Sequence, residues 1–138
     1  MDEQTLRNLL NLEPEKSISK IQIFDEIDST NSESLRQIQS GNIENRVVVA
    51  SSQTAGRGRR GRQWLSPKNA GIYLSLTRRF SMEANALQAL SLVTAISVVE
   101  ALYQLGAQGL QLKWPNDVLF EKKKLALSLI HISEPTRR

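Results

Sequence analysis

The stretch Gln53–Trp64 reads QTAGRGRRGRQW and places three glycines among four arginines. Glycine allows the backbone to turn sharply and to approach a ligand closely, and arginine presents a planar fork of N–H donors to anions. The stretch has no apolar period, so it is neither an amphipathic helix nor a buried strand, and it lacks the Gly-Lys-Ser/Thr of a Walker loop. Three interpretations stay open: an anion-binding loop, a solvated basic turn, and a contact with nucleic acid.

A second stretch, Lys113–Asp117, reads KWPND. It follows a short strand pattern, and Pro115 is expected to break the strand and turn the chain. A lysine at the end of a strand is held more rigidly than one on a loop tip, which suits a fixed charge in a binding site. We expect the rest of the chain to bring this stretch and Gln53–Trp64 together.

The remaining sequence predicts alternating strands and helices. Helices are expected over residues 2–12, from the segment 28–31 to about 39, and over 85–105; strands are expected over 18–27, 46–52, 71–77, 110–113 and 118–120. This alternation, without an internal repeat, indicates an α+β or mixed α/β domain. The helix over 85–105 has apolar residues at three-residue steps with others beside them, so we expect it to be largely buried.

Composition limits the class of protein. A chain of 138 residues with 40% hydrophobic residues forms one domain at most. It has no uninterrupted run of 18 apolar residues and no signal-peptide pattern, so we expect no transmembrane helix and a cytoplasmic location. It has no cysteine and one histidine, which leaves no metal site built on those residues. A net charge of +4, partly concentrated in the arginine stretch, favours a local anion site over a broad nucleic-acid surface.

The segment Asp28–Asn31 reads DSTN and precedes a predicted helix. Its short polar side chains are typical N-caps, which is the simpler interpretation of Ser29, Thr30 and Asn31. Ligand binding is compatible with capping, because the first turn of a helix leaves backbone N–H groups free.

Taken in order, five features resemble the biotin–protein ligase family: DSTN at 28–31, Gln53, the GRGRRGRQW run, GIYLSL at 71–76, and KWPND at 113–117. The resemblance runs from about Ile18 to Ala126. It implies an α+β catalytic domain with a mixed β-sheet and packed helices, similar to class II aminoacyl-tRNA synthetases. It also implies a ligase that converts biotin and ATP to biotinyl-5′-AMP and transfers biotin to a lysine of the biotin carboxyl-carrier domain of a carboxylase.

The resemblance assigns roles to individual residues. It implies that Lys113 and Arg57 are catalytic through their charges, with Mg²⁺ accompanying ATP and no metal site on the protein. Trp64 would cover the ligand, although base stacking and packing of the loop base are alternatives for this side chain. The residues that would bind substrate are Ser29, Thr30, Asn31, Gln53, Arg57, Gly58, Arg59, Trp64 and Lys113.

Four further charged residues keep more than one interpretation. Asp117 either assists deprotonation of the acceptor lysine or caps the turn. Lys124 matches a family lysine close to the reacting centre. Arg60 and Arg62 are either solvent-exposed or help to retain the adenylate. We also expect the arginine loop to be mobile without substrate, because its cations repel each other and little apolar surface holds it.

The resemblance divides the chain into three parts. Residues 1–17 form an N-terminal helical segment, 18–126 a partial catalytic domain, and 127–138 an aberrant, non-native tail, since Leu127 stands where the family has glycine. On this division later strands and the family's DNA-binding domain are missing, which makes DNA an unexpected partner. The alternatives are a ligase for lipoate or another acyl carboxylate, a basic nucleic-acid-binding module, and a protein that binds biotin without completing catalysis.

Overall fold

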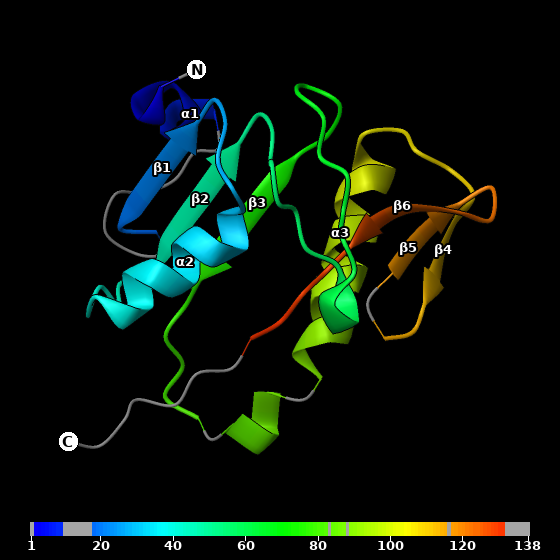
Figure 1. Ribbon diagram of the computed structural model, residues 1–138. Coiled ribbons are helices and arrows are strands. Elements are labelled where there is room, and N and C mark those ends of the chain that lie inside the picture. The colour runs from blue at the N-terminus through cyan, green and yellow to red at the C-terminus, as the bar shows by residue number, and fades with distance from the viewer. Residues whose placement is uncertain (1, 10–17, 83, 88, 116, 132–138) are drawn as a thin grey trace. The chain divides into compact units, whose positions relative to one another are not determined.

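The computed structural model describes residues 2–9, 18–82, 84–87, 89–115 and 117–131 (Figure 1). Contacts within the chain divide it into two compact units, Met1–Phe80 and Ser81–Arg138. Each unit has its own three-stranded sheet and its own helix packed on that sheet. The mixed strands and packed helices confirm the predicted α+β class.

The sheet of the first unit is mixed. Its strands are β1 (Lys20–Phe24), β2 (Arg46–Ala50) and β3 (Tyr73–Thr77), in that order. β1 and β2 are parallel, and α2 (Thr30–Gln39) lies in the connection between them, whereas β2 and β3 are antiparallel. Figure 1 shows α2 lying across these strands. The predicted strand over 18–27 is shorter in the structure, and Ile27 instead forms an isolated bridge with Gln53.

The core of this unit lies between α2 and the sheet. Val48, at the centre of the middle strand, is fully buried, and its register partner Ser75 lies on the same face. On the opposite face Val47 is buried, whereas Leu74 and Leu76 are each 54% exposed. The short helix α1 (Glu3–Leu9) is tied to the start of β1, because Arg7 donates hydrogen bonds to two backbone carbonyls there. The predicted end of this helix, residues 10–12, lies outside the described part of the chain.

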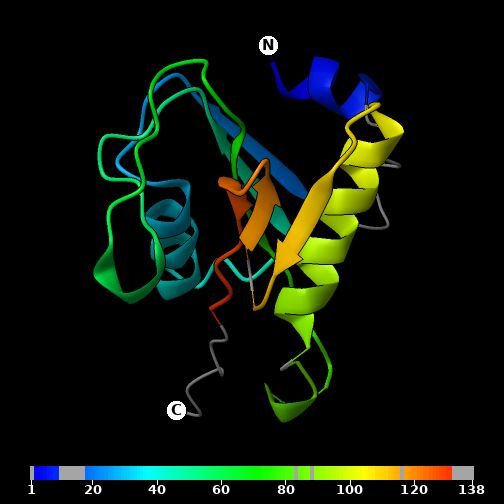
Figure 2. The ribbon, with the colours of Figure 1, turned by 90° about the vertical axis from the view of Figure 1, so that its right-hand side faces the viewer.

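The second unit is a helix beside an antiparallel sheet. A short 3₁₀ turn, η2 (Ala84–Leu87), precedes α3 (Leu90–Gln104), and the strands follow in the order β4 (Leu110–Lys113), β5 (Asp117–Phe120) and β6 (Lys123–Leu127). Figure 2 shows α3 running beside β4. A two-residue turn with positive φ at Glu121 and Lys122 joins β5 to β6, as a tight hairpin requires.

The prediction that the helix over 85–105 is largely buried is wrong. Ala95 is the one side chain of α3 that is buried, and Leu92, Val93 and Ile96 are 41%, 54% and 40% exposed. Apolar residues lie around most of the helix, so its sequence pattern does not indicate which face is covered. Within its own unit the helix packs on β4 and β5. By length and mean hydropathy (1.6), the segment Asn85–Gln104 would also suffice to cross a membrane, as would many core helices of soluble proteins.

Candidate functional site

The start of α2 places two predicted binding residues in the interior. Ser29 is the N-cap, as the sequence predicts, and its Oγ accepts a hydrogen bond from the Ser32 backbone N–H at 3.4 Å. Ser29 and Thr30 are 1% and 4% exposed. Buried hydroxyl groups must be hydrogen-bonded to offset the loss of water, so the partners of these side chains determine what they can still offer to a ligand.

Gln53 is the centre of the hydrogen bonds that satisfy Thr30. Its Oε1 accepts from the Thr30 backbone N–H at 2.9 Å and from Thr30 Oγ1 at 3.2 Å. Thr30 Oγ1 in turn accepts from Ser75 Oγ at 2.9 Å, and Gln53 Nε2 donates to Ser66 Oγ at 2.8 Å. Ser66 and Ser75 were assigned no role from the sequence. The strand period of β3, which puts Ser75 on the face toward α2, was the signal that could have found it.

Asn31 contributes an acceptor without a partner. Its Oδ1 is buried and makes no hydrogen bond within the described part of the chain. A buried amide oxygen without a donor costs free energy, and a ligand with an N–H group would satisfy it.

The arginine stretch forms a hairpin with a hydrogen-bonded base and an exposed tip. Gln53 N–H donates to Ser66 O at 3.1 Å, and Trp64 N–H donates to Gly56 O at 2.9 Å. Nearer the tip, Gly58 N–H donates to the Arg62 carbonyl at 2.7 Å. The stretch, predicted to be neither an amphipathic helix nor a buried strand, is a pair of antiparallel segments closed by a 3₁₀ turn, η1 (Arg59–Gly61).

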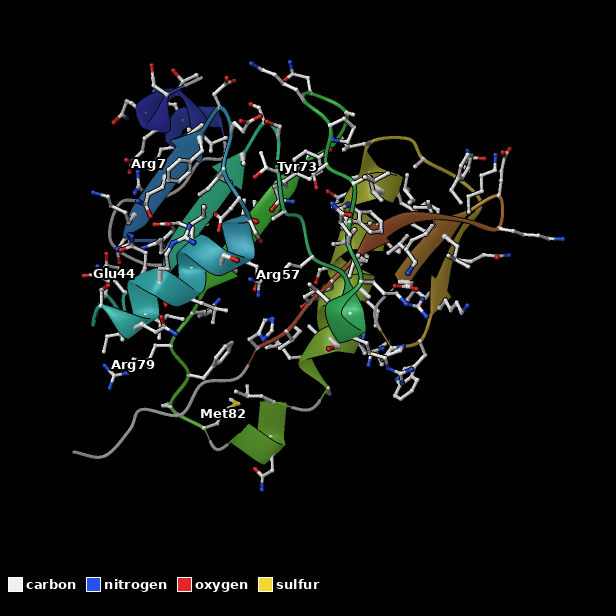
Figure 3. All side chains as sticks on the ribbon, viewed as in Figure 1. Arg7, Glu44, Arg57, Tyr73, Arg79 and Met82 are labelled. Carbon is white, nitrogen blue, oxygen red and sulfur yellow. The ribbon has the colours of Figure 1, made fainter. Side chains whose placement is uncertain are left out.

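The four arginines of this hairpin are exposed, and Trp64 is half-buried at its base. Arg57, labelled in Figure 3, lies two residues before the turn and forms an antiparallel backbone β-bridge with Gln63. Arg60 has a positive φ of 57° at the tip. The hairpin thus displays several cations that an anionic ligand could pair with, beside the buried Thr30 and the half-buried Gln53.

An ion-pair network lies at the start of α2, beside the base of the hairpin. Arg36 donates to both carboxylate oxygens of Asp28, at 2.8 and 2.9 Å, and also to Glu33. The guanidinium of Arg36 lowers the pKa of Asp28 from 3.8 to about 2. Asp28 also accepts the Ala55 N–H through its backbone carbonyl at 2.8 Å, so it connects α2 to the base of the hairpin.

The second unit holds the other predicted residues. Lys113 is exposed at the end of β4 and is paired in register with Asp117 of β5. Asp117 and Lys124, whose roles the sequence left open, form an ion pair of 2.7 Å across β5 and β6. Trp114 is 80% exposed, and Asn116 of the KWPND motif lies outside the described residues. The approach of Lys113 to the arginine hairpin stays a prediction.

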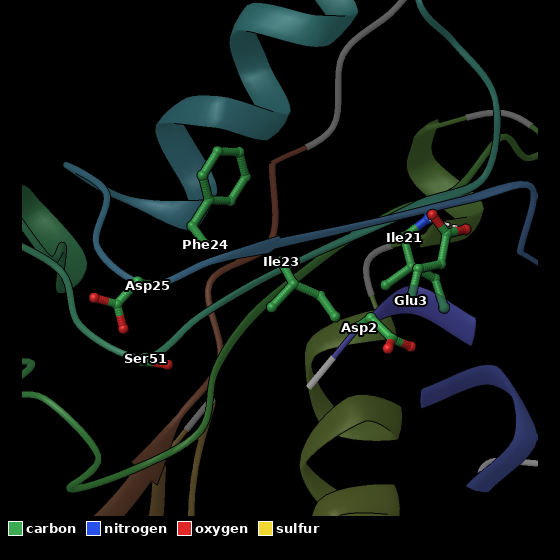
Figure 4. Close-up of a pocket in the computed structure, with 7 residues that line it drawn as sticks. All are labelled: Asp2, Glu3, Ile21, Ile23, Phe24, Asp25 and Ser51. Atoms are coloured by element: carbon green, nitrogen blue, oxygen red, sulfur yellow. Dashed lines mark hydrogen bonds between the residues drawn. The ribbon is translucent and has the colours of Figure 1, made fainter. Parts of the chain in front are cut away.

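A shallow pocket elsewhere in the first unit does not fit an anionic substrate. It is lined by Asp2, Glu3, Ile21, Ile23, Phe24, Asp25 and Ser51 (Figure 4). Three of these side chains are carboxylates, which would repel a carboxylate or a phosphate. Asp25 forms an ion pair of 2.8 Å with Lys68, a residue that does not line the pocket. The described residues also include no cluster of three His, Cys, Asp or Glu that could hold a metal ion.

Comparison with known proteins identifies the family of the chain. The sequence profile of the Biotin/lipoate A/B protein ligase family matches residues 23–134. Over 113 residues, 80% of the chain, the sequence is 41% identical to the bifunctional ligase/repressor BirA of Escherichia coli. Over 98% of the chain it is 35% identical to the biotin–[acetyl-CoA-carboxylase] ligase of Mycobacterium tuberculosis.

The fold is also similar to solved structures. The biotin protein ligase from Aquifex aeolicus, in complex with biotin and ATP, superimposes with a TM-score of 0.69 and 36% sequence identity over 85% of the chain. The chain spans 34% of the Escherichia coli protein, 52% of the Mycobacterium tuberculosis protein and 48% of the Aquifex aeolicus chain. It therefore corresponds to about a third to a half of each of these proteins.

Proposed function

Because the chain belongs to the Biotin/lipoate A/B protein ligase family, we propose that it provides the biotin-activating part of a biotin–protein ligase. The observation that carries this proposal is a polar group at the base of an arginine-rich hairpin, formed by the buried Ser29 and Thr30 and the half-buried Gln53. Such a site offers hydrogen bonds to a neutral polar ring and cations to a carboxylate and phosphates. Biotin and ATP together have these features.

The polar group would bind the ureido ring of biotin. Thr30 Oγ1 gives its proton to Gln53 and accepts one from Ser75, so its remaining capacity is that of an acceptor for a ligand N–H. The unpartnered Asn31 Oδ1 is a second acceptor. Ser29 Oγ accepts from Ser32, and its own proton is available to a ligand carbonyl. A cyclic urea carries two N–H groups and one carbonyl, which complements this set.

The first chemical step joins two anions. The biotin carboxylate is already ionised at neutral pH, so no general base is needed. One carboxylate oxygen attacks the α-phosphorus of Mg-ATP, the bond to the bridging oxygen breaks, and pyrophosphate leaves with its electron pair. Biotinyl-5′-AMP remains.

Fixed positive charge lowers the barrier to this step. We assign Lys113 and Arg57 to the reacting carboxylate and α-phosphate, and Arg59 to the phosphates. Gly58 allows the backbone to approach them. Trp64 covers the ligand and helps to exclude water from the mixed anhydride.

In the second step an acceptor lysine attacks the acyl carbon. An amide bond forms, AMP leaves, and the amine loses a proton. We propose that the acceptor is the biotin carboxyl-carrier domain of a carboxylase. The name of the Mycobacterium tuberculosis relative, a biotin–[acetyl-CoA-carboxylase] ligase, supports this class of partner. We place the reaction in the cytoplasm, with residues 18–126 as its catalytic part.

The proposal is tested by incubating the chain with biotin and Mg-ATP and measuring biotinyl-5′-AMP by mass spectrometry. Removing one group that stabilises the developing charge lowers the rate by about 10²–10³-fold, so Lys113→Ala and Arg57→Ala should form adenylate at least about a hundred times more slowly. Lys68→Ala is the control, because this lysine pairs with Asp25 on the surface. Adenylate from lipoate but not biotin would reassign the chain to a lipoate ligase, and no adenylate from either acid would contradict the proposal.

A further inference from the structure

The side-chain amide of Gln53 has one possible orientation in this structure. The Thr30 backbone N–H can only donate a hydrogen bond, so the Gln53 atom that lies 2.9 Å from it must be the amide oxygen. The amide nitrogen therefore points to Ser66 Oγ, 2.8 Å away. The backbone N–H of Thr30 therefore determines which atom of the Gln53 amide is oxygen and which is nitrogen.

Ser66 is oriented from its other side by the hairpin. Its side chain is 5% exposed, and its hydroxyl donates to the Trp64 carbonyl at 3.3 Å. A hydroxyl has one proton, so a Ser66 that donates to Trp64 presents a lone pair to Gln53. The backbone of Gln53 also donates to the Ser66 carbonyl at 3.1 Å, so the two residues are joined at both backbone and side chain.

The hydrogen bonds run in one direction across four parts of the unit. Ser75 on β3 donates to Thr30 at the start of α2, Thr30 donates to Gln53 at the end of β2, Gln53 donates to Ser66, and Ser66 donates to the Trp64 carbonyl in the hairpin. Each donation fixes the proton of the next group, and such chains strengthen one another in a buried setting. Ser66 is the member that connects the polar group to the hairpin.

We propose that Ser66 is a positioning residue for ligand recognition. It holds the Gln53 amide in one orientation, leaves the second Nε2 proton for the ligand, and ties this amide to the segment that carries Trp64. The inference rests on the proposed biotin-binding function, and it adds a residue that does not itself touch the ligand. Glycine at position 56 makes room for this pair, because an added Cβ there would lie 2.6 Å from Ser66 Oγ and 3.2 Å from Gln53 Nε2.

The test is a double-mutant cycle on biotin affinity, measured by calorimetric titration of the full chain. One net hydrogen bond corresponds to about threefold to tenfold in affinity, so Ser66→Ala should weaken biotin binding by about that factor. In the Gln53→Ala background the same change should weaken binding by less than about twofold, because the amide that Ser66 orients is gone. Ser66→Thr, which keeps the hydroxyl, should retain more affinity than Ser66→Ala.

Ser52→Ala is the matched control. Ser52 is also 5% exposed and directly precedes Gln53, and its hydroxyl lies 3.2 Å from the Asp25 carbonyl and 3.4 Å from Glu26 Oε2, the two acceptors to which it can donate. It should lower thermal stability without changing biotin affinity. Equal affinity losses in Ser52→Ala and Ser66→Ala, or an undiminished loss in the Gln53→Ala background, would overturn the positioning role while leaving biotin binding intact. Absence of binding by the folded parent chain would instead overturn the proposed function and this inference with it.

Discussion

Gly56 is the position where the hairpin depends most directly on glycine. A Cβ atom there would lie 2.4 Å from the Trp64 carbonyl oxygen and 2.6 Å from Ser66 Oγ. The first of these atoms belongs to the backbone and cannot rotate away. Ordinary contacts begin near 3.4 Å, so in Gly56→Ala the two antiparallel segments must separate by about 1 Å.

The cost follows from what this separation breaks. Forcing an extra carbon into a packed site costs about 1–3 kcal/mol. The Trp64 N–H bond to Gly56 O, 2.9 Å long, lies at the same point, and its loss adds about 1 kcal/mol. We therefore expect Gly56→Ala to lower the free energy of unfolding by about 2–4 kcal/mol. It should also weaken biotin binding, since Ser66 and Gln53 move with the two separating segments of the hairpin.

Urea unfolding followed by tryptophan fluorescence and circular dichroism measures this change. Gly71→Ala is the matched control, because the nearest atom to its added Cβ is a Tyr73 side-chain carbon at an ordinary 3.4 Å. Removing a glycine without strain changes stability little or raises it by about 0.4–1 kcal/mol. If the two variants unfold within about 0.5 kcal/mol of each other, the close approach at Gly56 is not what holds the hairpin.

Three further predictions concern stability and the hairpin tip. Because Arg36 lowers the pKa of Asp28 from 3.8 to about 2, the contribution of the pair to stability is present in full above the unfolded pKa and is lost as pH falls through about 2. Asp28→Asn should therefore lower the urea midpoint much less near pH 2 than near pH 6, and equal differences at the two pH values would contradict this. Val48→Ala should cost about 2–3 kcal/mol of unfolding free energy, since this side chain is fully buried, whereas Ile72→Ala, at a residue 87% exposed, should cost under about 0.5 kcal/mol. Trypsin should cleave the exposed tip at residues 59–62, and biotin with Mg-ATP should slow this cleavage; equal rates with and without ligands would count against closure of the tip over the substrate.

Local patterns accounted for most of the secondary structure. The polar segment before α2 and the glycine after it predicted that helix, and Ser29 caps it while Gly41 follows it with a φ of 86°. The apolar run Val47–Ala50 predicted the buried middle strand. These predictions were confirmed because each depends on the chemistry of a few neighbouring residues.

Longer-range properties were beyond the sequence patterns. The burial of α3 depends on which elements cover it, and a helix with apolar residues around most of its circumference does not indicate the covered face. The side chains of the arginine stretch have no apolar period and so do not predict its pairing, which comes from backbone hydrogen bonds such as Gly58 N–H to Arg62 O. The roles of Ser66 and Ser75 depend on residues that are 13 and 45 positions away in sequence, Gln53 and Thr30 respectively.

In the proposed function, the hydrogen-bonded side chains of Thr30 and Gln53 hold the ureido ring of biotin. The most direct measurement is a calorimetric titration of the full chain with biotin, in parallel with Gln53→Ala and with Thr30→Val, which removes the hydroxyl between Gln53 and Ser75. We expect one biotin bound per parent chain and an affinity at least about tenfold weaker in each variant, since a buried partner is left unsatisfied. A folded parent chain that binds no biotin, or variants that bind it as tightly as the parent, would contradict the account.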